Sequence, residues 1–261
     1  MPALWTRDDL ARHLTDLGLV HGDAVLVHAG LRSVGPILGG PDALIGALQD
    51  AVGPTGTILG YCDWQLDEEA RDDPALREHV PAFDPLSSRS IRDNGAFPEL
   101  LRTTPGALRS ASPGASCAAL GGRAGWFVAN HALDYGYGPQ SPLGKLVEAK
   151  GKTLLLGAPL DTMTLLHHAE HLADIPGKRV LRYESPILVD GHKVWRRFEE
   201  FDTGDPIVDG LAEDYFDDVV EDFLATGQGK RGLIGHAPSV LVDAPAIVAF
   251  AVEWLERRFP H

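Results

Sequence analysis

The amino-acid sequence predicts a mixed α/β protein, and two features carry that prediction. Early in the chain, short apolar segments of strand length enclose an amphipathic segment of helix length, which is the pattern of a parallel βαβ unit. Later, two strand-like segments flank Asp190-Gly191, a dipeptide that favours a hairpin turn and therefore an antiparallel pair. The 261 residues, 44% of them hydrophobic, suffice for a sizeable core, and we treat residues 1–261 as a single domain.

Capping residues and apolar spacing specify the first elements. Thr6 and Asp9 have the spacing of a helix N-cap and its partner, and the leucines that follow fall on one helix face. The segments 23–28 and 57–62 are apolar runs typical of buried strands. Between them, residues 41–52 begin with proline and have their apolar residues in helical phase. Strand, helix and strand in this order predict a parallel pair of strands.

The rest of the chain continues the α/β pattern. Residues 65–94 are polar and contain prolines, which predicts an excursion with short helices that acts as a flap. Apolar periodicity predicts further helices over 95–102, 122–130, 142–149, 161–173 (capped by Asp161 or Thr162), 211–225 and 244–258. It predicts further strands over 116–120, 152–156, 179–189 and 192–201.

The net charge of the chain limits the classes of partner that we expect it to bind. A formal net charge of −14 argues against nucleic acid and against anionic membranes, because both are bound by clustered Lys and Arg. Two stretches concentrate the acids: one between residues 63 and 73, and one between 199 and 222 that contains no Lys or Arg. Composition alone leaves two interpretations equally open, a pair of solvated faces or a surface that binds a polycationic ligand.

The cellular context follows from what the sequence lacks. No apolar run approaches the length of a membrane span, and acids stand where a signal peptide would need basic residues. Cys62 and Cys117 are too few and too isolated for a disulfide framework or a zinc cluster. We expect both to be reduced core residues of a cytoplasmic protein.

The loop from His28 to Gly40 is the first candidate binding element. It joins a predicted strand to a predicted helix and is rich in glycine, so its free N–H groups suit a pyrophosphate. Ser33 adds a hydroxyl donor and Arg32 adds a positive charge. An ordinary strand-to-helix loop remains open, because the dinucleotide fingerprint is absent and the pattern of a phosphate-binding P-loop fails at Leu146.

The strongest candidate for catalysis is the sequence TLLHHAEH over 164–171. His167, Glu170 and His171 have i, i+3 and i, i+4 spacing, which puts them on one face of a helix. Imidazole is the general base best matched to neutral pH, and a carboxylate on the same face fixes its tautomer. Two alternatives stay open, a wet cluster of surface histidines and a zinc site on His167 and His171, although a third zinc ligand is not evident.

Two further motifs are weaker. FDTGDP over 201–206 follows a predicted strand, so its carboxylates sit at a strand end, although capping of a turn explains them equally well. RSASPGAS over 109–116 offers small hydroxyl residues to a cofactor, and an ordinary loop is an equal alternative. A serine-nucleophile elbow at Ser116 fails, because Ala118 stands where glycine is required.

Taken together, these segments resemble the antibiotic N-acetyltransferase family of aminoglycoside 3-N-acetyltransferases, which is distinct from the GCN5-type enzymes. The resemblance covers nearly the whole chain. The segments that carry it are VHAGLRSVGP (27–36), AVGPTGTILGY (51–61), FDP (83–85), RSASPGAS (109–116), LLLGAPLDTMTLLHHAEHLADIPGKR (154–179), FDTGDP (201–206) and IVAFAVEWLERRF (247–259). NHALDYGYGPQSPLGKLV (130–147) resembles the broad-spectrum type III subgroup.

The resemblance implies a fold, a donor and a set of site residues. The fold is a mixed α/β sandwich with the site between two subdomains, and the donor is acetyl-CoA. His167 matches the catalytic base, Glu170 its partner carboxylate, and Asp205 a supporting acid for which Asp202 competes. The cofactor residues are His28, Ala29, Gly30, Leu31, Arg32, Ser33, Val34, Ser110 and Ala111. This chain departs from many members at Gly30, where they have a hydroxyl residue, and at Ser112, where they have histidine.

The implied reaction transfers acetyl directly from acetyl-CoA to the 3-amine of the 2-deoxystreptamine ring of drugs such as kanamycin and gentamicin. It needs no metal and gives antibiotic resistance. The aminoglycoside carries several ammonium groups, so we expect carboxylates of the acidic stretches to bind it. We expect the contacts to be made by Asp63, Gln65, Asp202, Glu221 and Asp222. We expect a monomer or homodimer; the alternatives are transfer to another amine and zinc-dependent hydrolysis.

Overall fold

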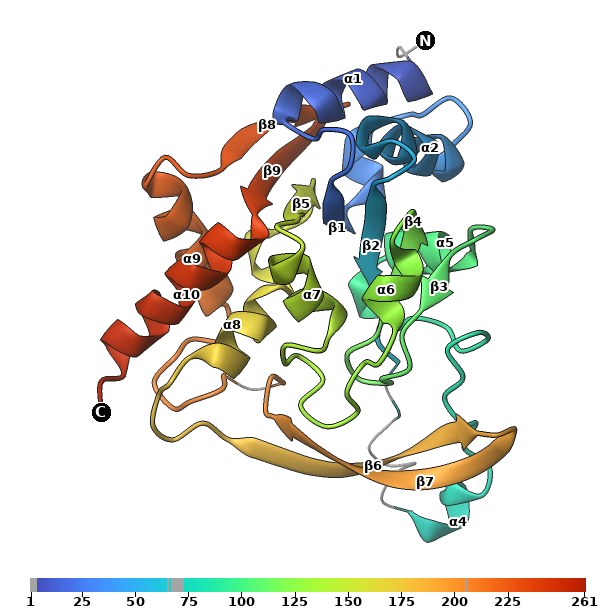
Figure 1. The fold of residues 1–261 in the computed structure, drawn as a ribbon, viewed down its shortest axis with the longest axis vertical. Helices are drawn as coiled ribbons and strands as arrows, with labels where there is room; N and C mark the ends of the chain where they lie inside the picture. Colours follow the sequence, from blue (N-terminus) through green and yellow to red (C-terminus); the bar gives the residue numbers. More distant parts are fainter. Residues whose placement is uncertain (1–3, 65, 67–72, 205) are drawn as a thin grey trace.

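The middle layer of the protein is a mixed β-sheet (Figure 1). The structure is a computed structural model that describes residues 4–64, 66, 73–204 and 206–261. Seven of the described strands form this sheet in the order β3-β4-β2-β1-β5-β9-β8. β1 is parallel to both β2 and β5, and the other neighbours are antiparallel. The strands are β1 (Ala24–Ala29), β2 (Thr57–Tyr61), β3 (Leu108–Arg109), β4 (Cys117–Gly121), β5 (Lys152–Leu156), β8 (Lys230–Ile234) and β9 (Ala237–Asp243).

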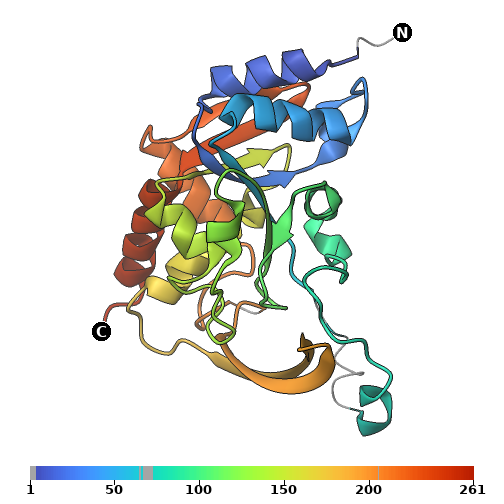
Figure 2. The same ribbon diagram turned by 45° about the vertical axis from the view of Figure 1, so that its right-hand side comes forward.

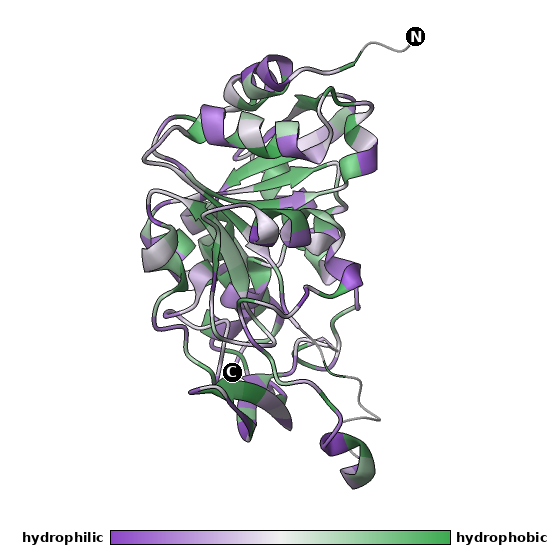
Figure 3. Ribbon diagram, turned by 90° about the vertical axis from the view of Figure 1, so that its right-hand side faces the viewer, coloured by the Kyte–Doolittle hydropathy of each residue, from purple (hydrophilic) through white to green (hydrophobic). Residues whose placement is uncertain are grey.

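Helices cover both faces of the sheet, because both faces of its central strands are apolar. Along β1, Val25 and Val27 point into one core, which α1, α2 and α5 complete. Ala24 and Leu26 point into the other core, which α6 to α10 complete. Figure 3 shows the apolar strands between more polar helices. The helices are α1 (Arg7–Leu17), α2 (Pro41–Val52), α4 (Pro74–Arg77), α5 (Phe97–Thr103), α6 (Ala124–Val128), α7 (Pro142–Glu148), α8 (Leu166–Leu172), α9 (Tyr215–Ala225) and α10 (Ala244–Arg258).

Local signals in the sequence account for several of these boundaries. Thr6 and Asp9 form the expected capping box at α1, and Ser141 caps α7 through the N–H of Gly144. Among the described helices, none combines the length and apolarity needed to cross a bilayer. Cys62 and Cys117 are buried free thiols, and burial raises the pKa of Cys62 to about 11, as expected for unreactive core residues.

A separate two-stranded hairpin lies at one end of the molecule. β6 (Val180–Val189) and β7 (His192–Phe201) pair antiparallel along their whole length. The turn residues Asp190 and Gly191 both have positive φ, 49° and 77°, as a two-residue hairpin turn requires. The described residues 73–94 lie beside this hairpin (Figure 2), where Phe83 pairs with the backbone of β6.

The expected mixed α/β architecture is confirmed, with two corrections to its elements. The predicted helix over 161–173 is divided into a 3₁₀ turn, Leu160–Thr162, and α8, because Met163 between them has a non-helical ψ of 76°. The hydroxyl of Thr162 donates to the carbonyl of Pro159 at 2.6 Å, so it closes the short turn instead of capping α8. The second correction adds strands that were not predicted: the antiparallel pair β8 and β9 at one edge of the sheet, and the two-residue β3 at the other.

Candidate active site

The site lies where the parallel strands end, because the carboxyl ends of β1, β2 and β5 meet at one edge of the sheet. β1 ends with His28 and Ala29, and the loop that follows it continues through Ser33. The chain after β2 leads to Asp63, and the chain after β5 leads through Gly157 to α8. Segments far apart in sequence are therefore brought together by the parallel pairing that the βαβ pattern predicts.

A smaller cavity of about 420 Å³, here called the glycine cavity, is lined by Ala29–Ser33, Gly95, Ala96 and Gly157. The loops after β1 and β5 touch each other there. The N–H of Gly30 donates to the carbonyl of Leu156 at 2.9 Å, and the hydroxyl of Ser33 donates to the carbonyl of Gly30 at 2.6 Å. A Cβ atom on Gly30 would lie 2.3 Å from the carbonyl oxygen of Gly157, so this contact requires glycine.

A larger cavity of about 750 Å³, here called the acidic cavity, lies near the glycine cavity. His28 precedes Ala29, which lines the glycine cavity, and its Nε2 is 3.3 Å from Oγ1 of Thr164, which lines the acidic cavity. The side chains with chemistry to offer come from several elements. They include Tyr61, Asp63, Tyr137, Thr164, His167, Glu184, Glu200 and Asp202. The hydroxyls of Tyr61 and Tyr137 are 2.7 Å apart, and that of Tyr61 donates to the carbonyl of Gly114 at 2.9 Å. The lining of the acidic cavity therefore contains a histidine, carboxylates and phenols.

His167 is oriented by a buried carboxylate. Its Nδ1 lies 2.6 Å from Oε2 of Glu170, and Tyr215 donates its hydroxyl to Oε1 of the same carboxylate at 2.6 Å. The side chain of Glu170 is only 3% exposed, whereas the side chain of His167 is 18% exposed and lines the acidic cavity. Burial and the neighbouring Glu170 raise the pKa of Tyr215, so it stays a donor. With Nδ1 engaged, Nε2 of His167 is the nitrogen left to exchange a proton in the cavity.

The other histidines of this region support the backbone. Nδ1 of His168 is 2.7 Å from the carbonyl of Tyr137, and Nε2 of His131 is 2.7 Å from that of Gly136, so both hold the segment 131–137 in place. Burial lowers the pKa of His131 and of His171 to about 4, which keeps these rings neutral. Within the described ranges, no group of three or more His, Cys, Asp or Glu side chains is arranged to hold a metal ion.

Glu200 is a carboxylate that the segment 131–137 fixes at the cavity. It accepts hydrogen bonds from the backbone N–H of Gly136 and, at 2.9 Å, from that of Phe201. Burial raises the pKa of Glu200 to about 7; these backbone hydrogen bonds and the nearby His167 limit the rise. Glu200 therefore changes its charge within the physiological range of pH.

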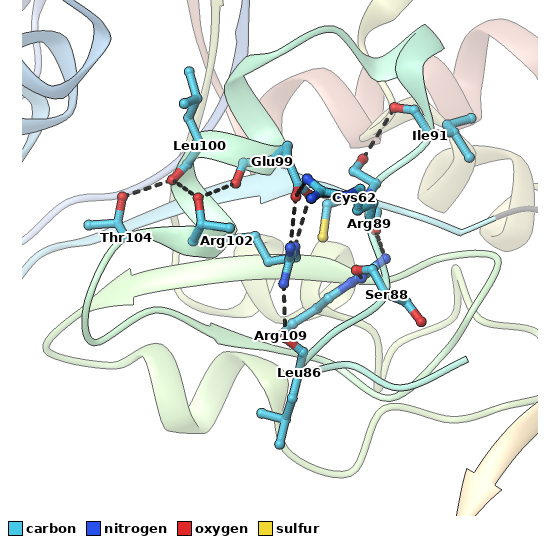
Figure 4. A network of polar contacts seen from close by, with 12 residues as sticks. Cys62, Leu86, Ser88, Arg89, Ile91, Glu99, Leu100, Arg102, Thr104 and Arg109 are labelled. Carbon is cyan, nitrogen blue, oxygen red and sulfur yellow. Dashed lines mark hydrogen bonds and ion pairs between the residues drawn. The ribbon is translucent and has the colours of Figure 1, made fainter. Parts of the chain in front are cut away.

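Asp63, which is 2% exposed, is anchored at the start of a second segment. The side chain of Asn94 donates to its carboxylate, and the N–H of Ile91 donates to its carbonyl at 3.2 Å. Figure 4 shows the network behind this segment. Arg109 donates to the carbonyls of Cys62 and Ser88, and Arg102 to the carbonyl of Leu86. The buried Arg109, first residue of the RSASPGAS motif, therefore supports the wall that carries Asp63.

The structure gathers some of the predicted residues and separates others. His28–Ser33, Asp63, His167, Glu170 and Asp202 lie at or beside the two cavities. Val34 is buried in a core, Ser110 bonds the N–H of Cys117, and Ala111 is exposed, so none of these lines either cavity. Gln65 and Asp205 lie outside the described residues.

Glu221 and Asp222 belong to α9 and do not line the acidic cavity. Glu221 forms an exposed ion pair with Arg231 at 2.6 Å. Asp222 accepts from the indole N–H of Trp254 at 2.8 Å. Their place in the acidic stretch 199–222 is therefore no guide to their orientation, because the helix directs both side chains to other partners.

Sequence reasoning did not select Thr164, Tyr61, Tyr137, Glu200 or Tyr215. Glu200 belongs to the acidic stretch, which marked its region but could not tell it from its neighbours. Thr164 lies three residues before His167 and is the first residue of the motif 164–171, but the sequence pattern assigned it no role of its own. The three tyrosines carry no local signal, because only the folded chain brings their hydroxyls to the site.

The fold and the site define a class of protein: an enzyme that transfers a group to a cationic acceptor. A histidine held by a buried carboxylate faces a cavity with further carboxylates, and a backbone-lined pocket suited to a phosphorylated cofactor adjoins it. The carboxylates suit ammonium groups, and the histidine suits the removal of a proton.

Comparison with known proteins agrees with this class. The family profile described as aminoglycoside 3-N-acetyltransferase matches residues 26–256. Aminoglycoside N(3)-acetyltransferase III of Pseudomonas aeruginosa is 47% identical over 95% of this chain and 93% of that relative. The solved structure of AAC-IIIb in binary complex with CoASH is 63% identical, has a TM-score of 0.95 and covers 98% of both chains. The structure of AAC-VIa bound to sisomicin is 41% identical, has a TM-score of 0.93 and covers 99% of this chain and 100% of that one.

The chain belongs to the aminoglycoside 3-N-acetyltransferase family. The predicted family, enzyme class and fold are thereby confirmed, as is acetyl-CoA as the donor of the acetyl group. The chain is an acyltransferase of the antibiotic-resistance type, and the relationship favours acetyl transfer over the hydrolase alternative.

Proposed function

We propose that His167 is the general base that removes a proton from the 3-amine of a bound aminoglycoside as the amine attacks acetyl-CoA. One observation carries this proposal: the 2.6 Å contact between His167 and the buried Glu170 at the wall of the acidic cavity. Alkylamines have a pKa of roughly 10, so the amine arrives protonated and needs a base. General-base catalysis of this kind contributes about 10²–10⁴-fold.

Glu170 acts on the histidine rather than on the substrate. Its carboxylate fixes the tautomer with the proton on Nδ1 and stabilises the imidazolium that forms during transfer. Tyr215 holds the second oxygen of that carboxylate and so sets its angle. The arrangement supports direct transfer within a ternary complex, because donor and acceptor cavities adjoin and no nucleophilic side chain needs to carry the acetyl group.

Each substrate is assigned to one of the two cavities. The pyrophosphate arm of acetyl-CoA lies in the glycine cavity against the loop 29–33, where backbone N–H groups and Arg32 meet its charge. The aminoglycoside lies in the acidic cavity, where Asp63, Glu200 and Asp202 contact its ammonium groups. A flap over 65–94 would cover this second cavity, since Leu66, Ile91 and Asn94 belong to the lining of the cavity.

Acetyl-CoA is a metabolite of the cytoplasm, and we place the enzyme there. A net charge of −14 repels nucleic acid and anionic lipid, so the partners are the two substrates alone. We propose a monomer or homodimer, which analytical ultracentrifugation resolves directly.

The test of the proposed function is release of coenzyme A thiol from acetyl-CoA with a panel of aminoglycosides, with and without a chelator. We expect chelator-insensitive release with deoxystreptamine drugs. His167→Ala is expected to bind aminoglycoside normally by calorimetry and to lose at least about 10²-fold in kcat. His171→Ala, on the same helix, is the matched control and should keep its rate within about threefold. Loss of activity in both variants together with chelator sensitivity would instead support the zinc hypothesis.

A further inference from the structure

The thioester of acetyl-CoA must lie where the glycine cavity meets the acidic cavity. His28 marks that junction, because the next residue, Ala29, lines the glycine cavity. The other side of the junction is Thr164, whose side chain lines the acidic cavity with His167. Nε2 of His28 is 3.3 Å from Oγ1 of Thr164, so the two residues connect the cavity walls.

Attack on a thioester places negative charge on its carbonyl oxygen, and a fixed donor aimed at that oxygen lowers the barrier. Several donors near the junction are already engaged. The N–H of Gly30 donates to Leu156, and the N–H and hydroxyl of Ser33 both donate to the carbonyl of Gly30. The hydroxyl of Thr162 is engaged by Pro159. The hydroxyl of Thr164 differs, because its partner is a histidine that can itself be the donor.

The state of His28 decides what the threonine can do. Burial, with a smaller contribution from the nearby His167, lowers the pKa of His28 to about 4, so the ring is neutral when the enzyme works. A neutral ring with its proton on Nε2 donates to Oγ1 of Thr164. The hydroxyl proton of Thr164 is then available to a group in the acidic cavity.

We propose that Thr164 is a catalytic residue that donates its hydroxyl to the thioester oxygen in the transition state, and that His28 is a positioning residue that orients this hydroxyl. The inference rests on the proposed function of His167.

The step is balanced without a further reactant. The amine lone pair forms the C–N bond, the carbonyl pair moves onto oxygen, and Thr164 stabilises that oxyanion while keeping its own proton. The amine that attacks is neutral, because its first proton has already passed to water; His167 takes the second proton, which the nitrogen loses once the C–N bond has formed. Collapse of the intermediate breaks the C–S bond, and the departing thiolate takes the proton from His167.

The experiment compares Thr164→Val, which removes the hydroxyl and keeps the shape, with Thr164→Ser, which keeps the hydroxyl. We expect Thr164→Val to lower kcat by about 10²–10³-fold, with both KM values within about twofold, and Thr164→Ser to retain most of the rate. Thr162→Val is the matched control, because its hydroxyl closes a turn, and should not change kcat. Thermal unfolding checks each variant, and Thr164→Ala replaces the valine variant if that one does not fold.

His28 is tested through its dependence on Thr164. His28→Ala should lower kcat by about tenfold in the parent enzyme but have almost no effect in Thr164→Val, because the hydroxyl that it orients is gone. His28→Gln, whose amide nitrogen can reach the position of Nε2, should restore part of the rate. Additive losses in the double variant would overturn the positioning role.

The outcomes separate this inference from the function on which it rests. An active parent enzyme with an unchanged kcat in Thr164→Val, or with only a raised KM, overturns the role of Thr164 and leaves His167 untouched. A parent enzyme that releases no thiol with any aminoglycoside overturns the proposed function and this inference together.

Discussion

The acidic cavity and the glycine cavity are built in opposite ways. The acidic cavity presents side chains, and each of them is held by a partner behind it: Glu170 behind His167, Asn94 beside Asp63, and backbone N–H groups around Glu200. The glycine cavity presents backbone, and its shape comes from the contact between Gly30 and Gly157. A change of charge at constant size should therefore damage the first cavity, whereas a change of size at constant charge should damage the second.

The largest effect is expected in the acidic cavity, at Glu170. Glu170→Gln keeps the size of the side chain but removes the charge and allows the amide to present N–H to His167, which favours the wrong tautomer. We expect kcat to fall by about 10³–10⁴-fold while aminoglycoside affinity stays within about threefold. Tyr215→Phe, which removes only the hydrogen bond to the same carboxylate, should cost about tenfold. Steady-state kinetics and calorimetry measure both, and equal losses in the two variants would contradict this ranking.

The next effect belongs to the glycine cavity. Gly30→Ala adds one methyl group that would lie 2.3 Å from a backbone oxygen, so the loop must move. We expect the KM for acetyl-CoA to rise by at least about 10²-fold, with aminoglycoside binding in the absence of acetyl-CoA unchanged. Gly125→Ala in α6, where the added atom would have its first neighbour at 4.0 Å, is the control. A Gly30→Ala enzyme with normal KM would show that this contact does not shape the donor site.

The comparison also explains how much of the site could be predicted from sequence. Features that depend on spacing along one element were recoverable: His167 and Glu170 by their i, i+3 separation, and the βαβ order that brings loop 29–33 to the sheet edge. Features that depend on the direction in which a side chain points could not be predicted. Glu221 and Asp222 lie in the densest acidic stretch, yet α9 turns them toward Arg231 and Trp254. Glu200 belongs to the same stretch and reaches the cavity, because β7 and the segment 131–137 fix it there.

The fold was predictable to a similar degree. α2, β5 and α10 match the predicted bounds, since each has clear periodicity and capping or turn residues at its ends. β8 could not be predicted because Lys230, Arg231 and Gly232 leave it only two apolar residues, and β9 because Pro238 and Ser239 interrupt its apolar run. Their pairing depends on β5, to which β9 adds, and that is a tertiary contact that no local pattern records.

A smaller effect is expected at Asp63, where charge alone is changed. Asp63→Asn should weaken aminoglycoside binding by about 10–100-fold, the range for a hydrogen bond to a charged group, and should reduce the dependence of affinity on salt. Glu221→Gln is the matched control, because its carboxylate is exposed and faces Arg231 instead of the cavity. Calorimetric titrations between low and high salt measure both, and equal weakening in the two variants would place the recognition outside the acidic cavity.

The smallest effect concerns pH and Glu200. Because burial raises the pKa of Glu200 to about 7, this carboxyl is mostly neutral at pH 6 and mostly charged at pH 8. A bound ammonium group favours the charged form. The groups that face Glu200 are His167 on α8, the N–H of Phe201 on β7 and, on the loop before α7, the phenols of Tyr135 and Tyr137 and the N–H groups of Gly136 and Tyr137. Aminoglycoside affinity of the parent enzyme, relative to Glu200→Gln at each pH, should therefore rise by at most about tenfold from pH 6 to pH 8.

Taking this ratio removes the contribution of the aminoglycoside, whose own amines lose protons in the same direction for both enzymes. Calorimetry without acetyl-CoA gives the affinities, and repetition in buffers of different ionisation enthalpy counts the protons released on binding. The parent enzyme should release more protons than Glu200→Gln near pH 7, since the ligand drives Glu200 to its charged form. A constant affinity ratio with equal proton release would mean that Glu200 supports the segment 131–137 without touching the ligand. The carboxylates left to bind the ligand would then be Asp63, Asp202 and Glu184, and Glu184 already pairs with Arg77 at 2.8 Å.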